Sequence, residues 1–137
     1  MIGINDCSKK EIPTDVFDKN LVRLQKQIRQ SGAVPIFHTP NLIIKDKSAA
    51  RAGIEDYVKV MRQVASDHQI LLVDNYAYWQ ETLDQSNNVD VFKDWLNDPL
   101  HPNGIGHQEI ARQLFKCLSI FDPNEPTCGG AYYEGEH

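Results

Sequence analysis

Residues 70–79 read ILLVDNYAYW, and this stretch predicts the fold class. Its four leading apolar residues are typical of a strand that lies in a parallel sheet and is buried on both faces. Asp74 and Asn75 follow directly, so polar side chains are expected at the carboxyl end of the strand. One polar and three aromatic residues here could line a substrate cleft, although aromatic residues after a buried strand more often pack in the core or on the surface. These residues are Asp74, Tyr76, Tyr78 and Trp79.

The chain before this strand predicts two helices and two further strands. Apolar residues recur at helical spacing over residues 16–30 and again over residues 49–67. Between these helices, AVPIFHTP at residues 33–40 predicts a strand, with Pro35 near its start, where the missing backbone donor matters least. The opening residues, MIGIND, predict the end of another strand. The apolar face of the second helix comprises Ile54, Tyr57, Val58, Met61, Val64 and Ala65.

The C-terminal part of the chain completes the pattern. A short helix is expected over residues 89–96 and a final helix over residues 103–118, with Asn103 as its N-cap. The order of strands and helices predicts an α/β fold with a short parallel sheet, in one domain over residues 1–118. Residues 119–137 are acidic and lack lysine and arginine, so we expect an extended or loosely ordered tail. The inward face of the final helix should comprise Ile110, Ala111, Leu114, Cys117 and Leu118.

Composition and charge limit the classes of function. The 137 residues are 41% hydrophobic and 24% charged, which is typical of a soluble globular domain with one core. The net charge of −5 and the lack of a lysine or arginine run argue against nucleic-acid and anionic-membrane partners. No apolar stretch approaches the roughly 20 residues of a membrane span, and no signal peptide is evident. We therefore expect a soluble protein with a small-molecule ligand, and its localisation stays open. The cysteines are too few and too scattered for a disulfide framework or a zinc site, namely Cys7, Cys117 and Cys128.

The run DPLHPN at residues 98–103 carries the strongest indication of chemistry. Asp98 and His101 stand three residues apart, so the carboxylate can accept the Nδ1 hydrogen of the imidazole and leave Nε2 free as a general base. These are two members of a catalytic triad. A metal site formed by Asp98, His101 and His107 is the competing interpretation, but its spacing fits no standard zinc motif. We therefore expect neither a metal ion nor a cofactor.

Two motifs resemble conserved blocks of one enzyme family. GIND at residues 3–6 resembles the third block of the SGNH hydrolases, also called GDSL esterases and lipases, and DPLHPN resembles the fifth block. HTP at residues 38–40 and the helix after DPLHPN also fit this family. The resemblance implies a flavodoxin-like three-layer α/β/α sandwich, here incomplete. It also implies hydrolysis of a small-molecule ester, such as a carbohydrate ester or a short-chain acyl ester.

The resemblance also implies roles for three residues. His101 would be the general base, Asp98 would orient it, and Asn5 would donate its side-chain amide to the oxyanion. In the family, two earlier blocks carry the nucleophilic serine and a glycine oxyanion donor, and neither block occurs in this sequence. The chain therefore resembles the C-terminal portion of an SGNH hydrolase. We expect it to be weakly active or inactive by itself.

Two residues directly after GIND are the nearest substitutes for the absent serine. Cys7 follows the expected oxyanion donor, and a thiolate beside His101 could attack an ester. A small residue in a loop is the simpler interpretation of Cys7. Ser8 lacks the sharp strand-to-helix turn that presents a nucleophilic hydroxyl.

Two functions therefore stay open. The first is an ester hydrolase whose serine lies outside these 137 residues. The second is a non-catalytic remnant or binding module with the same fold. In either case, loss of the first two strands would expose the edge of the sheet, so we expect the chain to form homo-oligomers through that edge.

Overall fold

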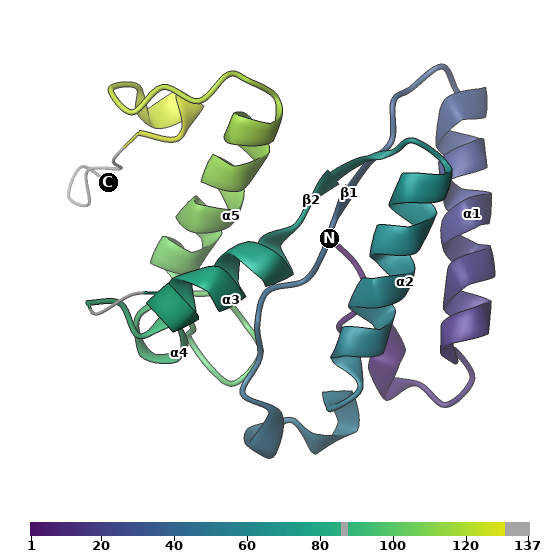
Figure 1. Ribbon diagram of the computed structural model, residues 1–137, viewed down its shortest axis with the longest axis horizontal. Helices are drawn as coiled ribbons and strands as arrows, with labels where there is room; N and C mark the ends of the chain where they lie inside the picture. The colour runs from purple at the N-terminus through teal and green to yellow at the C-terminus, as the bar shows by residue number, and fades with distance from the viewer. Residues whose placement is uncertain (86–87, 131–137) are drawn as a thin grey trace.

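Two short parallel strands lie at the centre of the computed structural model, which describes residues 1–85 and 88–130 (Figure 1). β1 (Ile36–His38) pairs with β2 (Leu71–Val73), with Ile36 opposite Leu71. A parallel pair requires a crossover connection, and α2 (Ile54–Asp67) provides it. The predicted α/β class with a short parallel sheet is therefore confirmed. The other helices are α1 (Thr14–Gln30), α3 (Asn75–Gln85), α4 (Val91–Asp94) and α5 (Gly104–Cys117), with 3-10 helices at Asp6–Ser8, Lys45–Lys47, Ala49–Arg51 and Pro126–Cys128.

The largest part of the core lies between α1, α2 and the sheet. α1 and α2 run side by side, and the rings of Phe17 on α1 and Tyr57 on α2 are 5.1 Å apart between centroids (Figure 1). All six residues of the predicted apolar face of α2 are buried, so this face is confirmed. Helical spacing identifies such a face because residues three and four apart share one side of the helix.

α3 begins directly after β2. Trp79 of α3 is completely buried, and its ring packs against the edge of the Trp95 ring at 5.1 Å between centroids. Tyr76 is also buried in this core. The helix starts here because the Asp74 carboxylate accepts a hydrogen bond from the Ala77 N–H in its first turn. Two of the three aromatic residues after β2 therefore serve mainly as core residues.

The strand predicted for MIGIND does not form. Gly3 has a φ of +109°, which turns the chain after two residues, and the 3-10 helix Asp6–Ser8 follows. The Asp6 carboxylate stabilises this turn by accepting a hydrogen bond from the Gly3 N–H at 3.1 Å. Two strands, rather than the predicted three, make up the sheet of the described residues.

Burial of β2 and α5 is also less complete than predicted. Leu71 of β2 is 39% exposed, so the strand is not covered on both faces. On α5, Leu118 at the C-cap is 39% exposed, and the other four predicted inward residues are only partly buried. α5 contacts β2 near Cys117, whose thiol lies 3.9 Å from the Leu72 carbonyl oxygen. With two strands, the sheet is too narrow to cover the apolar face of this helix.

The segment after α5 folds back on this helix over residues 119–130 instead of extending. Arg112 of α5 donates a hydrogen bond from Nε to the Gly129 carbonyl oxygen at 2.9 Å. Gly129 and Gly130 are buried. The rest of the predicted tail, residues 131–137, lies outside the described residues.

A close backbone approach fixes the start of α5. Gly106 is buried, and a Cβ atom at this position would lie 2.2 Å from the Trp95 carbonyl oxygen and 3.1 Å from Cη2 of Trp79. By contrast, nothing lies within 4 Å of a Cβ atom placed on Gly104, two residues earlier in the same helix. Glycine is therefore required at position 106 but not at position 104.

We expect Gly106→Ala to lower the free energy of unfolding by about 1–3 kcal/mol, the usual effect of overpacking a core. The loss is measured by urea denaturation followed by tryptophan fluorescence. Gly104→Ala is the matched control and should change the free energy of unfolding by less than about 1 kcal/mol. Equal effects of the two substitutions would contradict this account of the Trp95 contact.

Candidate active site

The predicted pair of Asp98 and His101 forms in the loop between α4 and α5. His101 Nδ1 lies 2.7 Å from Asp98 Oδ2 and 3.0 Å from Oδ1. Asp98 Oδ1 also accepts hydrogen bonds from the backbone N–H groups of Leu100 (2.8 Å) and His101 (2.9 Å). One carboxylate therefore shapes the turn and contacts the imidazole, which leaves His101 Nε2 available to a reacting group.

These hydrogen bonds keep the Asp98 carboxylate charged. The Leu100 N–H makes the largest contribution, followed by the His101 side chain, and together they lower the pKa of Asp98 to about 2. The Asp98 side chain is 43% exposed and the His101 side chain is 71% exposed. Since solvent screens charges this accessible, the arrangement orients the imidazole more than it stabilises the fold.

Neighbouring segments hold the loop in place. The Ile44 N–H donates to the Pro99 carbonyl oxygen at 2.9 Å, and Asn41 Nδ2 donates to the Leu100 carbonyl oxygen at 3.1 Å. Asn103 is the N-cap of α5, as predicted, and its Oδ1 accepts from the Gly106 N–H at 3.0 Å. The loop that carries Asp98 and His101 is thus attached in its middle and at the end where α5 begins.

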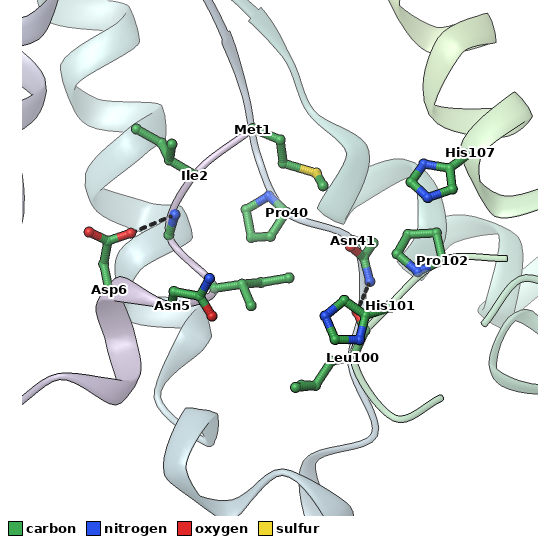
Figure 2. Close-up of a pocket in the computed structure, with 12 residues that line it drawn as sticks. Met1, Ile2, Asn5, Asp6, Pro40, Asn41, Leu100, His101, Pro102 and His107 are labelled. Carbon is green, nitrogen blue, oxygen red and sulfur yellow. Dashed lines mark hydrogen bonds between the residues drawn. The ribbon is translucent and has the colours of Figure 1, made fainter. Parts of the chain in front are cut away.

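Asn5 lies across a cavity from His101 (Figure 2). The cavity has a volume of about 320 Å³ and opens between the N-terminal segment, the chain after β1 and the loop of His101. Asn5 is exposed, and its Oδ1 accepts a hydrogen bond from Arg51 Nη2 at 3.1 Å. The predicted base and the predicted oxyanion donor therefore face the same space. Apolar and polar groups both line it, among them Ile2, Ile4, Pro40, Leu100, Asn41 and His107.

Cys7 and Ser8 are directed elsewhere. The Cys7 thiol donates to the Ile4 carbonyl oxygen at 3.2 Å, and the Ser8 hydroxyl donates to the Asn5 carbonyl oxygen at 2.8 Å. Burial raises the pKa of the Cys7 thiol, which disfavours a thiolate. Neither residue is among the described residues that line the cavity.

The structure does not assemble the competing metal site. Within residues 1–85 and 88–130, no group of three or more histidine, cysteine, aspartate or glutamate side chains is placed to hold a metal ion. His107 lines the cavity, but Asp98 is not among the residues that do so. As for a membrane, no helix in the described part of the chain is long and apolar enough to cross one.

Comparison with known families identifies the chain. Residues 1–109 match the model of the GDSL-like lipase/acylhydrolase family. The chain belongs to this family. Most of the fold and both predicted site segments lie inside the matched region, so the resemblance of GIND and DPLHPN to family blocks is supported at the level of the family. A comparison with curated proteins finds no match.

Solved structures of similar proteins agree with membership of the GDSL-like family. LAE5, an alpha/beta hydrolase enzyme from the metagenome of Lake Arreo, Spain, is 28% identical, with a TM-score of 0.70 over 87% of this chain. A catalytic mutant of Axe2, an acetylxylan esterase from Geobacillus stearothermophilus, is 26% identical, with a TM-score of 0.68 over 86% of this chain. The chain spans 57% of the length of each of these proteins.

Sequence patterns did not reveal two residues that shape the site. Asn41 is completely buried and anchors the His101 loop through Leu100, 59 residues away. Arg51 contacts Asn5 from 46 residues away. Neither contact has a characteristic spacing, because both depend on how distant segments pack. HTP at residues 38–40 was the nearest signal, since Asn41 follows it directly.

The shifted pKa of Asp98 gives a direct test of the geometry. We expect Asp98 to titrate near pH 2 instead of 3.8, so its hydrogen bonds contribute fully above pH 3.8 and are lost as the pH falls through about 2. In His101→Ala the pKa should rise only part of the way, since the Leu100 N–H contributes most. The measurement is ¹³C NMR of the carboxyl group during a pH titration. His107→Ala is the control and should leave the pKa of Asp98 unchanged. A full return of this pKa to 3.8 in His101→Ala would refute the conclusion that the Leu100 N–H makes the largest contribution.

Proposed function

We propose that this chain carries the general base and one oxyanion donor of a carboxylic ester hydrolase. The observation that carries the proposal is the Asp98–His101 pair facing Asn5 across one cavity. Membership of the GDSL-like lipase/acylhydrolase family and similarity to an acetylxylan esterase support it. Asp98, His101 and Asn5 then have the roles of orienting residue, base and oxyanion donor.

In this proposal His101 moves the proton. Its Nε2 removes the hydrogen of an attacking hydroxyl while Nδ1–H remains hydrogen bonded to the Asp98 carboxylate. The same Nε2 then returns the proton to the leaving alcohol, and the cycle repeats with water to release the acid. Asn5 Nδ2 donates to the oxygen that becomes negative in each tetrahedral intermediate. One such donor typically stabilises the transition state by about 2.7–4 kcal/mol.

The nucleophile of this mechanism is a serine outside these 137 residues. Among the described residues that line the cavity there is no serine, and the sequence lacks the block that carries the serine in the family. The domain formed by residues 1–118 would then be one part of a larger catalytic unit, with the acidic segment 119–137 attached. This agrees with the 57% of the neighbours' length that the chain spans.

The part of the cavity that this chain forms suits a small acyl group. Ile4, Pro40 and Leu100 offer it apolar contact, and the similar acetylxylan esterase points to a short acyl chain. The exposed His107 on the same wall offers a polar group that suits a polar alcohol such as a sugar. We therefore propose a short-chain ester of a carbohydrate as the substrate class.

The absence of a serine from the described lining of the cavity also favours a second candidate, a non-catalytic binding module with the same fold. Such a module would retain the cavity and bind an acetylated oligosaccharide without hydrolysing it. The two candidates differ in their dependence on His101, because a binding module needs no general base.

Hydrolysis of p-nitrophenyl acetate distinguishes them. We expect low turnover by the chain itself, and a rise by a factor of up to about 10⁶ when an in-frame upstream segment with a GDS-like serine is included. In both forms His101→Ala should abolish the enzymatic rate, while His68→Ala, the control for non-specific imidazole catalysis, should not. Loss of turnover in Cys7→Ala or Ser8→Ala would assign the nucleophile to this chain. Binding of an acetylated xylooligosaccharide without turnover in the extended protein would favour the binding module.

We further propose that, in residues 1–137 by themselves, the open edge of the sheet at β1 is covered by a second copy of the chain. Val34, just before β1, is 81% exposed. The unpaired backbone groups of such an edge attract a further strand.

Light scattering should therefore give a mass of at least two chains. Val34→Lys should shift this mass towards the monomer, because a charge at an edge opposes strand pairing. Leu24→Lys, at a 38% exposed position on α1, is the matched control and should not shift the mass. A monodisperse monomer of the unsubstituted chain would contradict the proposal.

A further inference from the structure

Arg51 makes two contacts with the N-terminal segment that the mechanism above does not use. Its Nε donates to the Ile4 carbonyl oxygen at 3.1 Å, and its Nη2 donates to Asn5 Oδ1 at 3.1 Å. We propose that Arg51 is a positioning residue that fixes the orientation of the Asn5 side-chain amide. This inference rests on the proposed function, since it assigns Arg51 to the same oxyanion site.

The orientation follows from the chemistry of the two side chains. An arginine guanidinium has only hydrogen-bond donors, whereas an asparagine amide has an acceptor oxygen on one side and a donor nitrogen on the other. Only Oδ1 of Asn5 can therefore face Arg51 favourably. With Oδ1 held, the donor nitrogen Nδ2 is the group left for a ligand, and no described residue accepts a hydrogen bond from it.

The oxyanion site depends on which side of the Asn5 amide faces Arg51. If the Asn5 amide turned over, Oδ1 could face the cavity and repel a developing negative charge, while Nδ2 would oppose the donors of Arg51. Asn5 is exposed and follows a turn at Gly3, so its own backbone does little to hold the side chain. Arg51 also holds the Ile4 carbonyl, so its planar fork fixes the backbone and the amide of Asn5 together.

The position of Arg51 beside Asn5 results from the packing of a segment that is distant in sequence. Arg51 ends the 3-10 helix Ala49–Arg51, which packs against the 3-10 helix Asp6–Ser8. The short turn before α2 therefore places a cation beside the expected oxyanion donor.

NMR of the ¹⁵N-labelled full chain tests the orientation without turnover. The Asn5 NH₂ signals are identified by their loss in Asn5→Ala. In Arg51→Glu the new carboxylate accepts from Nδ2, so one Asn5 amide proton should gain a hydrogen bond to it and shift downfield. Arg51→Lys keeps a donor and should leave the signals near their original positions. Lys9→Glu, an exposed charge reversal on the same segment, is the control.

Kinetics supply the second readout. Where hydrolysis of p-nitrophenyl acetate is measurable, Arg51→Glu should lower kcat by about 10²-fold with little change in KM, as loss of an oxyanion donor does. In the Asn5→Ala background Arg51→Glu should have no further effect, because the two residues act as one unit. Asn5 amide signals that do not move in Arg51→Glu, or independent effects in the double variant, would overturn the proposal. Absence of turnover in every form, with the NMR shifts as expected, would refute the proposed function and leave the role of Arg51 intact.

Discussion

The carboxylate of Asp74 joins both strands and two helices at one point. Its Oδ1 accepts hydrogen bonds from the Thr39 hydroxyl just after β1 (3.0 Å) and from the Ala77 N–H in the first turn of α3 (3.1 Å). Arg62 on α2 donates to both carboxylate oxygens, at 2.7 and 3.2 Å. Burial would raise the pKa of Asp74, but the hydrogen bonds from Arg62 and Ala77 outweigh it and keep the pKa below its usual value. The resulting charge fixes where β2 ends and α3 begins.

The position of the loop that carries His101 follows from this junction. Asn75 Nδ2 donates to the Thr39 carbonyl oxygen at 2.9 Å, which fixes the backbone just before the completely buried Asn41. Asn41 then donates to the Leu100 carbonyl oxygen in the loop of His101. Because these amides are buried, removing one partner would leave an unsatisfied polar group, at a typical cost of about 1–3 kcal/mol. The two strands are short, but the polar groups at their carboxyl ends define the site, as expected for a parallel sheet.

The sequence could predict features that depend on contacts between residues close in the chain, but not features that depend on contacts between distant residues. The buried face of α2 and the pair in DPLHPN were predictable, since their contacts recur within three or four residues. The opening strand was predicted wrongly because MIGIND has the apolar composition of a strand, while the positive φ of Gly3 leaves no trace in that pattern. Burial of β2 was overestimated for a related reason, because an apolar run does not specify what covers it. Arg51 had no signal at all, since its partner lies 46 residues away.

The stability of the fold and the candidate site therefore depend on different side chains of this chain. The core is formed by fully buried side chains on helices, such as Met61 and Trp79, whereas His101 and Asn5 are exposed. Exposed hydrogen-bonded pairs contribute little to the free energy of folding, so the proposed base and oxyanion donor do little to stabilise the fold. The positions of Asn5 and His101 depend strongly on the fold, because the two residues belong to segments that are far apart in the sequence. Their placement across one cavity results from the packing of the 3-10 helix at Arg51 and the loop at Asn41. A substitution in that packing can thus separate the two groups without touching either of them.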